Sequence, residues 1–310
     1  MAELKAKLII IGSGPAGYTA GIYAARAGSE PILISGYTIG GQLTMTANVE
    51  NFPGFFEPIS GSDLMEKMRK QALNFGVQMI DDRVTEVDLS ARPFVLSTEN
   101  GNCCKAESLI IATGASAKWL NIETEKQYIG RGISTCATCD GFFYKNMPVA
   151  IVGGGNSAAE EALYLTNFAS KVYVIHRRDQ LRADSILQER LFKNPKIEIV
   201  WNSVVEEFIG GKTISGVKLK NVLTDERKML DVSGVFLAIG HTPNTALFKK
   251  YINLDDDGYI LTKPKSTATN VEGVFACGDV QDNTYRQAVV AVGSGAMAAM
   301  EAQKYLSKMG

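Results

Sequence analysis

The sequence predicts an α/β protein of two Rossmann-like, three-layer nucleotide-binding domains, one of which is inserted into the other. The chain has 310 residues, which is enough for about two domains. An apolar run, a glycine-rich turn and a helical pattern follow one another twice, over residues 7–28 and again over 148–169. A further buried run ends at residues 278–279 and precedes a helical pattern over about 286–305, so we expect the first domain to resume after the insertion.

The first glycine-rich turn lies between a predicted buried strand and a predicted helix, with the spacing Gly12-x-Gly14-x-x-Gly17. Glycine lets the backbone approach a pyrophosphate closely, and the helix N-terminus presents unpaired N–H groups to it. A turn that only links a strand to a helix is the alternative, which the flanking elements disfavour. The next strand, in PILISG, lacks the acid that often binds an adenosine ribose, so other segments must support this site.

The second glycine-rich turn, residues 153–158, repeats the pattern, and the strand after its helix, KVYVI, leads into a basic cluster. The cluster consists of His176, Arg177, Arg178 and Arg182. An Asp or Glu at this place would bind a free ribose 2′-hydroxyl, whereas guanidinium groups bind a 2′-phosphate bidentately. The cluster therefore favours NADPH over NADH, with a solvated basic helix start as the alternative.

Two cysteines, Cys136 and Cys139, stand close together in STCATCDG. Such a pair holds half a zinc site or forms a redox-active disulfide. A zinc site needs about four ligands, and the chain has two histidines and no second Cys-x-x-Cys. We therefore expect a redox disulfide and no metal. The adjacent Cys103 and Cys104 are expected to be structural.

Two further predicted strands end in turns that suit a bound nucleotide. The run Leu109–Ala115 ends in a glycine turn, and GVFACGDV ends on Gly278 and Asp279. A carboxylate at a strand end can accept hydrogen bonds from a ribityl chain, and the same residue can also cap the following helix. Both segments support a flavin nucleotide at the first glycine-rich turn.

Nine short motifs, taken in order, resemble those of the low-molecular-weight, bacterial-type thioredoxin reductases, a group of class II pyridine nucleotide-disulfide oxidoreductases. The resemblance covers essentially the whole chain. The motifs are GSGPAG (12–17), GGQL (40–43), ATG (112–114), CATCDG (136–141), GGGNSA (153–158), HRR (176–178), GHTPNT (240–245), ACGDV (276–280) and RQA (286–288).

The resemblance implies a homodimer with FAD in an outer domain, 1–116 with 247–310, and NADPH in an inserted domain, 117–246. The residues expected around FAD are Gly12, Ser13, Gly14, Pro15, Ala16, Gly17, Gly41, Gln42, Leu43, Asn51, Val84, Ala112, Thr113, Gly114, Gly278, Asp279, Val280, Arg286, Gln287 and Ala288. Those expected around NADPH are Gly153, Gly155, Asn156, Ser157, Ala158, His176, Arg177, Arg178, Arg182, Ile239 and Gly240.

The function implied is reduction of the thioredoxin disulfide. NADPH reduces FAD, the reduced flavin reduces the Cys136–Cys139 disulfide, and the dithiol reduces thioredoxin. By resemblance, Cys139 lies nearer the flavin, Cys136 attacks the partner and Asp140 is the acid/base, although Asp140 could instead cap a turn or helix. The nicotinamide and the disulfide must reach one flavin from a single inserted domain, so we expect that domain to rotate.

Other functions are consistent with parts of the pattern. A ferredoxin/flavodoxin–NADP reductase of the same architecture lacks the Cys-x-x-Cys. A peroxiredoxin-linked disulfide reductase, the flavoprotein subunit of alkyl hydroperoxide reductase, carries an extra N-terminal thioredoxin-like region, whereas this chain begins at the flavin strand. A flavin-bound redox sensor would keep the glycine turns but turn over slowly, and the intact cysteine pair disfavours it.

Charge and hydropathy argue against two classes of partner. The net charge is −1 with mixed signs along the chain, so we expect no nucleic-acid binding. The most apolar C-terminal run, 289–300, is too short to span a bilayer, and no signal-peptide pattern precedes the first strand. We therefore expect a cytoplasmic protein that is not bound to a membrane.

Overall fold

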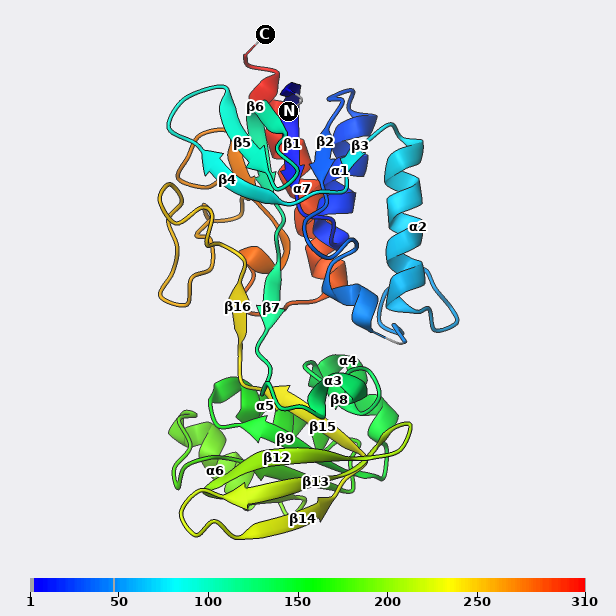
Figure 1. The fold of residues 1–310 in the computed structure, drawn as a ribbon, viewed down its shortest axis with the longest axis vertical. Coiled ribbons are helices and arrows are strands. Elements are labelled where there is room, and N and C mark those ends of the chain that lie inside the picture. Colours follow the sequence, from blue (N-terminus) through cyan, green and yellow to red (C-terminus); the bar gives the residue numbers. More distant parts are fainter. Residues whose placement is uncertain (1–2, 47, 310) are drawn as a thin grey trace. The chain divides into compact units, whose positions relative to one another are not determined.

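The computed structural model describes residues 3–46 and 48–309. Contacts divide the chain into two compact units: an outer unit, up to Ser116 and from Thr242 onward, and an inserted unit, Ala117–His241. Two short strands, β7 (Ala115–Ala117) and β16 (His241–Pro243), pair with each other where the chain passes between the units. Figure 1 shows that each unit is built on its own sheet.

The outer unit contains a seven-stranded mixed sheet with the order β3-β2-β1-β6-β5-β4, in which β17 also pairs with β6. The pairs β1–β2, β1–β6, β2–β3 and β6–β17 are parallel, and β4–β5 and β5–β6 are antiparallel. The strands are β1 (Glu3–Ile11), β2 (Ile32–Ile34), β3 (Gln78–Ile80), β4 (Val84–Asp88), β5 (Phe94–Thr98), β6 (Cys103–Ile111) and β17 (Val274–Ala276).

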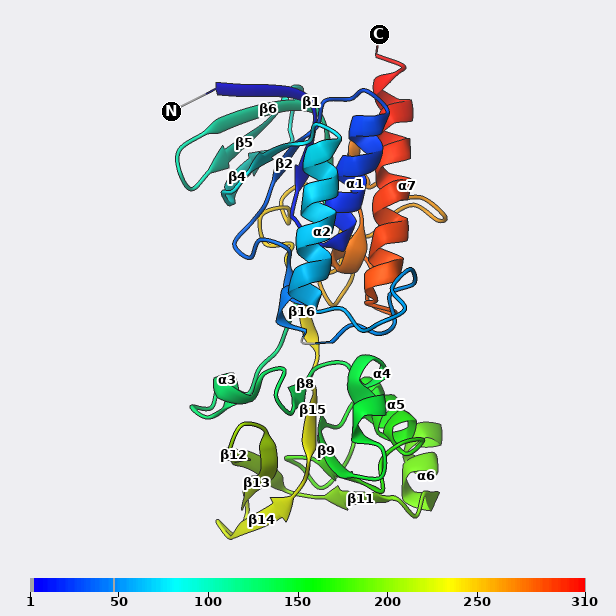
Figure 2. The same ribbon diagram turned by 90° about the vertical axis from the view of Figure 1, so that its right-hand side faces the viewer.

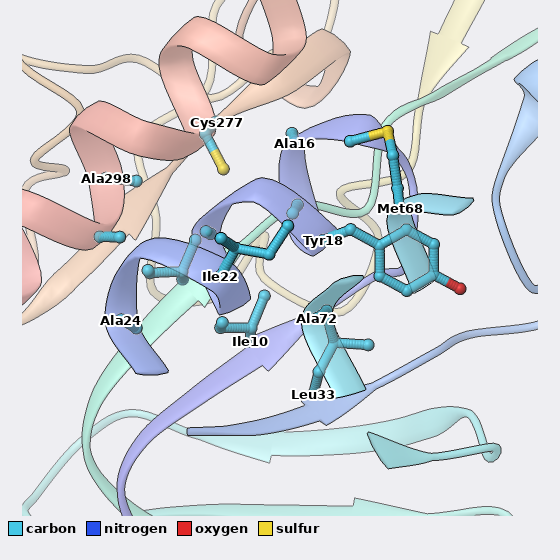
Figure 3. Close-up of a cluster of buried hydrophobic side chains, with 14 of the residues drawn as sticks. Ile10, Ala16, Tyr18, Ile22, Ala24, Leu33, Met68, Ala72, Cys277 and Ala298 are labelled. Atoms are coloured by element: carbon cyan, nitrogen blue, oxygen red, sulfur yellow. The ribbon is translucent and has the colours of Figure 1, made fainter. Parts of the chain in front are cut away.

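Three long helices cover one side of this sheet, as Figure 2 shows: α1 (Pro15–Arg26), α2 (Gly61–Asn74) and α7 (Ala288–Leu306). Side chains alternate along a strand, so Ile10 packs toward these helices while Ile9 and Ile11 pack in a second cluster with Phe248 and Ile252. Figure 3 shows the first cluster, where Tyr18 and Ile22 of α1 meet Met68 of α2 and Ala298 of α7.

Helices α1 and α7 approach closely because small residues face each other. A Cβ added to Gly295 of α7 would lie 2.3 Å from the carbonyl oxygen of Ala16. Two 3₁₀ turns, η1 (Gln42–Met45) and η3 (Gly278–Val280), complete the helical side. The close packing of α7 places the C-terminal segment beside the first glycine-rich turn, which begins α1.

The inserted unit contains a parallel five-stranded sheet with the order β11-β10-β9-β15-β8. Its strands are β8 (Ile133–Ser134), β9 (Pro148–Gly153), β10 (Lys171–Ile175), β11 (Ile197–Val200) and β15 (Gly234–Ala238). An antiparallel sheet is formed by β12 (Ser203–Gly210), β13 (Ile214–Asn221) and β14 (Arg227–Asp231). The helices are α3 (Glu125–Tyr128), α4 (Ala137–Asp140), α5 (Asn156–Leu165) and α6 (Ser185–Lys193), with η2 (Gly141–Tyr144).

Each unit therefore repeats the same local order of parallel strand, glycine-rich turn and helix, as the apolar runs predict. Buried strands such as β1 and β9 carry unbroken apolar runs, Leu8–Ile11 and Val149–Val152, which are typical of parallel sheets covered on both faces. No helix within residues 3–46 or 48–309 is long and apolar enough to cross a membrane.

Candidate active site and nucleotide sites

Cys136 and Cys139 form a disulfide at the start of α4 in the inserted unit. The carbonyl oxygen of Cys136 accepts the backbone N–H of Cys139 at 3.3 Å and that of Asp140 at 3.2 Å. The Cys136 N–H donates to the Ser134 hydroxyl at 3.0 Å. One tight turn of backbone, tied back to β8, thus holds the two sulfur atoms together.

Asp140 follows the disulfide directly and is half-buried. Burial raises the pKa of its carboxyl group, and a hydrogen bond with the Ser134 hydroxyl acts in the opposite direction. The Asp140 side chain forms no capping hydrogen bond at η2, which begins directly after it. A carboxyl group with a raised pKa holds its proton closer to neutral pH, which suits an acid that protonates a thiolate.

The redox turn is packed onto α5. A Cβ added to Gly141 would lie 3.1 Å from Leu165 and 3.5 Å from Phe168. Tyr144 packs edge-on against Phe236 of β15, and burial, followed by the charge of Asp140, raises the pKa of Tyr144 to about 12. Tyr144 therefore stays neutral, and the disulfide rests on the helix that begins at the second glycine-rich turn.

In the second glycine-rich turn one glycine, Gly153, packs closely against neighbouring atoms, and another, Gly155, is open. A Cβ on Gly153 would lie 2.5 Å from the Ala238 carbonyl oxygen and 2.6 Å from the Ala158 Cβ. Gly155, the N-cap of α5, has no atom within 4 Å of such a Cβ. The N-terminus of α5 is thus accessible to a pyrophosphate, while Ile239 and Gly240 directly follow the neighbouring strand β15.

The basic cluster follows β10 beside this turn, and its members differ in burial. Arg177, Arg178 and Arg182 are exposed, whereas His176 is buried. Asn156, expected near NADPH, exchanges two hydrogen bonds with Asp184, at 3.0 and 2.8 Å. Exposed guanidinium groups next to a free helix N-terminus form a suitable site for a ribose 2′-phosphate and a pyrophosphate.

The first glycine-rich turn is also packed closely against neighbouring backbone. Gly12 has a φ of +112°, and a Cβ there would lie 2.2 Å from the Ala112 carbonyl oxygen. Gly14, the N-cap of α1, is open, and a Cβ on Gly41 would lie 3.1 Å from the Gly14 Cα. The structure thus brings GGQL and ATG to the first turn, as expected of residues that surround one dinucleotide.

Ser13 lies in the same turn, but its side chain is used by the protein. The Ser13 hydroxyl donates to the Ser35 carbonyl oxygen at 2.8 Å and accepts the Gly40 N–H at 3.0 Å. It therefore ties the end of β2 to the GGQL segment, and only its backbone remains for a ligand.

The strand end at Gly278 and Asp279 reaches the same place. Gly278 has a φ of +74°, and a Cβ there would lie 2.9 Å from the Ala16 Cβ of α1. Burial, then the nearby charge of Asp282, raises the pKa of Asp279 to about 6, and Arg286 acts in the opposite direction. A buried carboxyl group beside an open helix N-terminus fits the ribityl hydroxyls of a flavin nucleotide.

Two other residues expected around FAD, far apart in the sequence, are joined by a hydrogen bond. The Asn51 side chain donates to Gln287 Oε1 at 3.3 Å, and Gln287 is the N-cap of α7, which begins at Ala288. Gln42 and Leu43 form the start of η1. Val84 lies at the start of β4 and, with Leu247, lines a hollow at the surface.

Two residues outside the expected set of site residues support these sites. Asn244 exchanges hydrogen bonds with Thr113: its side chain donates to the Thr113 carbonyl oxygen at 2.8 Å, and its own carbonyl oxygen accepts the Thr113 hydroxyl at 2.8 Å. Ser134 binds the redox turn as described. Asn244 lies in GHTPNT, so a motif marked it, whereas nothing in the sequence marked Ser134.

No group of three or more His, Cys, Asp or Glu side chains in residues 3–46 and 48–309 is placed to hold a metal ion. The donors present fit organic nucleotides instead: two open helix N-termini, a buried carboxyl group and exposed guanidinium groups. FAD would be held by the outer-unit set around Gly14 and Asp279, and NADPH by the inserted-unit set around Gly155 and Arg177.

Comparisons with known proteins identify the family. Residues 6–295 match the family model described as pyridine nucleotide-disulphide oxidoreductase. The thioredoxin reductase of Rickettsia felis is 59% identical over 309 residues, covering 99% of this chain and 100% of that protein. The thioredoxin reductase of Dictyostelium discoideum is 49% identical, covering 98% of each chain.

Solved structures of thioredoxin reductases resemble the fold of this chain. The thioredoxin reductase of Streptococcus pyogenes superposes with a TM-score of 0.94 at 41% identity, covering 98% of this chain and 99% of that one. That of Lactococcus lactis, titled "FR conformation", has a TM-score of 0.65 at the same 41% identity and coverage. The chain belongs to the pyridine nucleotide-disulphide oxidoreductase family, with two Rossmann-like domains and a redox disulfide in the inserted one.

Proposed function

We propose that this protein is an NADPH-dependent thioredoxin reductase that uses FAD and the Cys136–Cys139 disulfide. The observation that supports this most directly is the position of the disulfide. It is packed on α5, the helix that begins at the second glycine-rich turn, so the redox pair and the NADPH site belong to one unit. The relatives described above from Rickettsia felis, Dictyostelium discoideum and Streptococcus pyogenes bear the name thioredoxin reductase.

The cysteines perform the thiol chemistry. FAD held by the residues around Gly14 and Asp279 would supply the two electrons that open the disulfide, with NADPH as their source. Cys136 then attacks a sulfur atom of the oxidised thioredoxin, forming a mixed disulfide and releasing one thioredoxin thiolate. Cys139 attacks Cys136 in turn, which restores the internal disulfide and releases the second thioredoxin thiolate. Asp140 is placed to exchange the proton, because burial raises its pKa.

We further propose that the inserted unit rotates on the outer unit during each cycle. One flavin must meet the nicotinamide and the disulfide in turn, and both lie on the inserted unit. Two relatives of equal identity give TM-scores of 0.94 and 0.65, as expected if whole units move between solved states. A dye pair with one dye on each unit should change its transfer efficiency when NADP⁺ binds, and a constant efficiency would contradict rotation.

The outer unit also supports a homodimer. Helix α7 exposes three large apolar side chains at helical spacing, Val289, Met297 and Met300. They lie along one stripe of the helix because they are separated by about two turns and then about one turn. A second copy of this chain is the occupant we propose for that stripe. Sedimentation equilibrium should give twice the mass of one chain, and a monomer at micromolar concentration would contradict this.

We place the protein in the cytoplasm, where thioredoxin systems operate in a reducing medium. Support comes from its cysteines: Cys103, Cys104 and Cys277 are free thiols, and two of these three are buried. Fractionation of cells with an antibody would test this, and recovery from an oxidising compartment would contradict it.

The function is tested by a coupled assay on the purified, FAD-loaded protein. NADPH should be consumed when oxidised thioredoxin is added, with NADH far less effective. A small aromatic disulfide should also be reduced through the same cysteines. A protein that cannot bind FAD, or that consumes NADPH only with ferredoxin or flavodoxin as acceptor, would contradict the proposal.

The docking surface for thioredoxin is expected beside the disulfide. Phe142 is 58% exposed and Phe143 is 39% exposed, and Arg131 is exposed nearby in sequence. Exposed aromatic rings beside a reactive group are the type of anchor that dominates protein interfaces. Phe142→Ala with Phe143→Ala should raise the thioredoxin KM by about fivefold or more, because loss of even one anchoring ring costs about 1 kcal/mol at such interfaces. Steady-state kinetics at saturating NADPH measures this.

The control for this prediction is Leu223→Ala, which removes an exposed apolar side chain of the same unit away from the disulfide. It should leave the thioredoxin KM unchanged. Reduction of the small aromatic disulfide should change little in the double variant. Equal losses with both substrates would show that the rings support the fold, because Phe142 also packs edge-on against Phe168 at 5.9 Å.

A further inference from the structure

His176 stands first in the basic cluster, yet both nitrogens of its ring are used by the protein. The side chain is only 6% exposed. Its Nδ1 lies 2.9 Å from the Gly153 carbonyl oxygen, and its Nε2 lies 2.9 Å from the Gln180 carbonyl oxygen. Both partners are carbonyl oxygens, so a neutral ring donates a hydrogen bond to one of them and only the imidazolium form donates to both. Each nitrogen faces backbone, so neither is directed at a phosphate.

The two carbonyl groups belong to the two loops that bind different parts of a dinucleotide. Gly153 begins the glycine-rich turn, and Gln180 lies between Arg178 and Arg182 in the loop that carries the guanidinium groups. The imidazole ring is therefore a bridge between the pyrophosphate loop and the arginine loop.

Backbone contacts show that the two loops are joined along their length. The Gly154 carbonyl oxygen accepts the N–H of Arg182 at 2.6 Å and the N–H of Ala183 at 3.1 Å. Further along, Asn156, two residues after Gly154, and Asp184, the residue after Ala183, exchange their two hydrogen bonds. The His176 ring lies directly after β10, at the first of these contacts between the two loops.

Gly154 is the second element of the bridge. A Cβ added there would lie 2.2 and 2.3 Å from ring atoms of His176, and the three nearest atoms all belong to that ring. The φ of Gly154 is not in the left-handed region, so space for the ring, and not backbone conformation, requires glycine at this position. Trp201 packs edge-on against the ring at 6.3 Å and limits its movement.

The arginines themselves are exposed. Arg177, Arg178 and Arg182 take part in none of the ion pairs within residues 3–46 and 48–309. Their guanidinium groups are free to bind a phosphate, but exposed side chains on a loop need a fixed backbone to act together.

We propose that His176 is a positioning residue for the dinucleotide: it clamps the arginine loop to the glycine-rich turn and does not itself bind the 2′-phosphate. This role rests on the proposed use of NADPH. The proposal gives the histidine and the arginines of the HRR motif different roles. Losing an arginine removes contacts to the 2′-phosphate alone, whereas losing the clamp displaces the 2′-phosphate and pyrophosphate sites together.

The test is His176→Phe, which keeps a flat ring of similar size against Gly154 but removes both ring nitrogens and their contacts with the two carbonyl oxygens. We expect NADP⁺ affinity, measured by calorimetry on the FAD-loaded protein, to fall by about tenfold, which corresponds to the loss of about one hydrogen bond. KM should rise by a similar factor for NADPH and for NADH, with kcat at saturation little changed. A loss confined to NADP⁺ and NADPH would show that His176 is a phosphate ligand, and unchanged affinities would also overturn the clamp.

A second pair of variants tests the clamp from the other side. Gly154→Ala should weaken NADP⁺ as His176→Phe does, because the new methyl group displaces the ring. Combined with His176→Ala, the same methyl group finds room, so the double variant should bind no worse than His176→Ala alone. A double variant that loses the product of both single effects would overturn the proposal.

Failure of the proposed function and failure of the proposed role of His176 give different results. If the unaltered protein does not bind NADP⁺ in the calorimeter, the proposed function is wrong. If it binds NADP⁺ and the variants bind equally well, only the role of His176 is wrong. Flavin content and melting temperature of each variant, expected to match those of the unaltered protein, establish that the loops and not the whole unit are affected.

Discussion

Cys136→Ser and Cys139→Ser are each expected to abolish NADPH-driven reduction of thioredoxin, since either change leaves no disulfide to cycle. NADPH should still bleach the flavin absorbance, because hydride transfer to FAD does not need the cysteines. Stopped-flow absorbance of the flavin and a thioredoxin-coupled assay measure the two steps separately. The expected loss in thioredoxin turnover is on the order of a thousandfold or more, as for removal of a covalent nucleophile.

The matched control is Cys103→Ser, which removes a half-buried thiol of the outer unit and should leave turnover intact. A further result separates the two sulfur atoms. Because Cys136 is the attacking residue, Cys139→Ser should accumulate a covalent complex with thioredoxin, visible on a non-reducing gel, and Cys136→Ser should not. If flavin reduction also stopped in a folded variant, the proposed order of electron flow would be wrong.

Arg177→Ala with Arg178→Ala is expected to raise the NADPH KM by roughly a hundredfold, since a hydrogen bond to a charged group contributes about 1.5–3 kcal/mol. The KM for NADH should stay nearly constant, because NADH has no 2′-phosphate for these exposed guanidinium groups to bind. Steady-state kinetics with both cofactors and a small aromatic disulfide gives the ratio. The variant should thus lose its preference between the two cofactors, not its activity.

A control for this variant removes two positive charges elsewhere in the inserted unit. Arg190→Ala with Lys193→Ala, at the end of α6, alters net charge equally but lies outside the basic cluster. It should leave both KM values close to those of the unaltered protein. Parallel losses for NADPH and NADH in the arginine variant would instead show that these side chains hold the loop, the role argued above for His176.

The sequence by itself determined the features whose physical requirement is local. A Cβ added to Gly17 would lie 1.9 Å from the carbonyl oxygen of Gly12 in the same turn, so no other residue serves at this position. A continuous apolar run such as Val149–Val152 is typical of a strand buried on both faces. The spacing of Cys136 and Cys139 allows a disulfide within a single turn of backbone.

The tertiary structure alone decided how distant segments share a site. Gln287 meets Asn51, 236 positions away, and Gly278 lies against Ala16 at the start of α1. These contacts depend on the close packing of α7 on α1, which no local pattern specifies. Likewise, the pKa of Asp279 is raised first by burial beneath surrounding segments and only then by the charge of nearby Asp282.

The direction in which a side chain points was also undetermined by the sequence. Ser13 and His176 stand in motifs that suggest ligand contact. The Ser13 hydroxyl nevertheless hydrogen-bonds to backbone, and each ring nitrogen of His176 lies 2.9 Å from a backbone carbonyl oxygen. Residue type and spacing specify which groups are available, because they follow from covalent chemistry and backbone geometry. The hydrogen-bond partner of each group depends on which backbone atoms folding brings within about 3 Å of it. Buried donors are therefore already hydrogen-bonded within the protein and do not remain for a ligand.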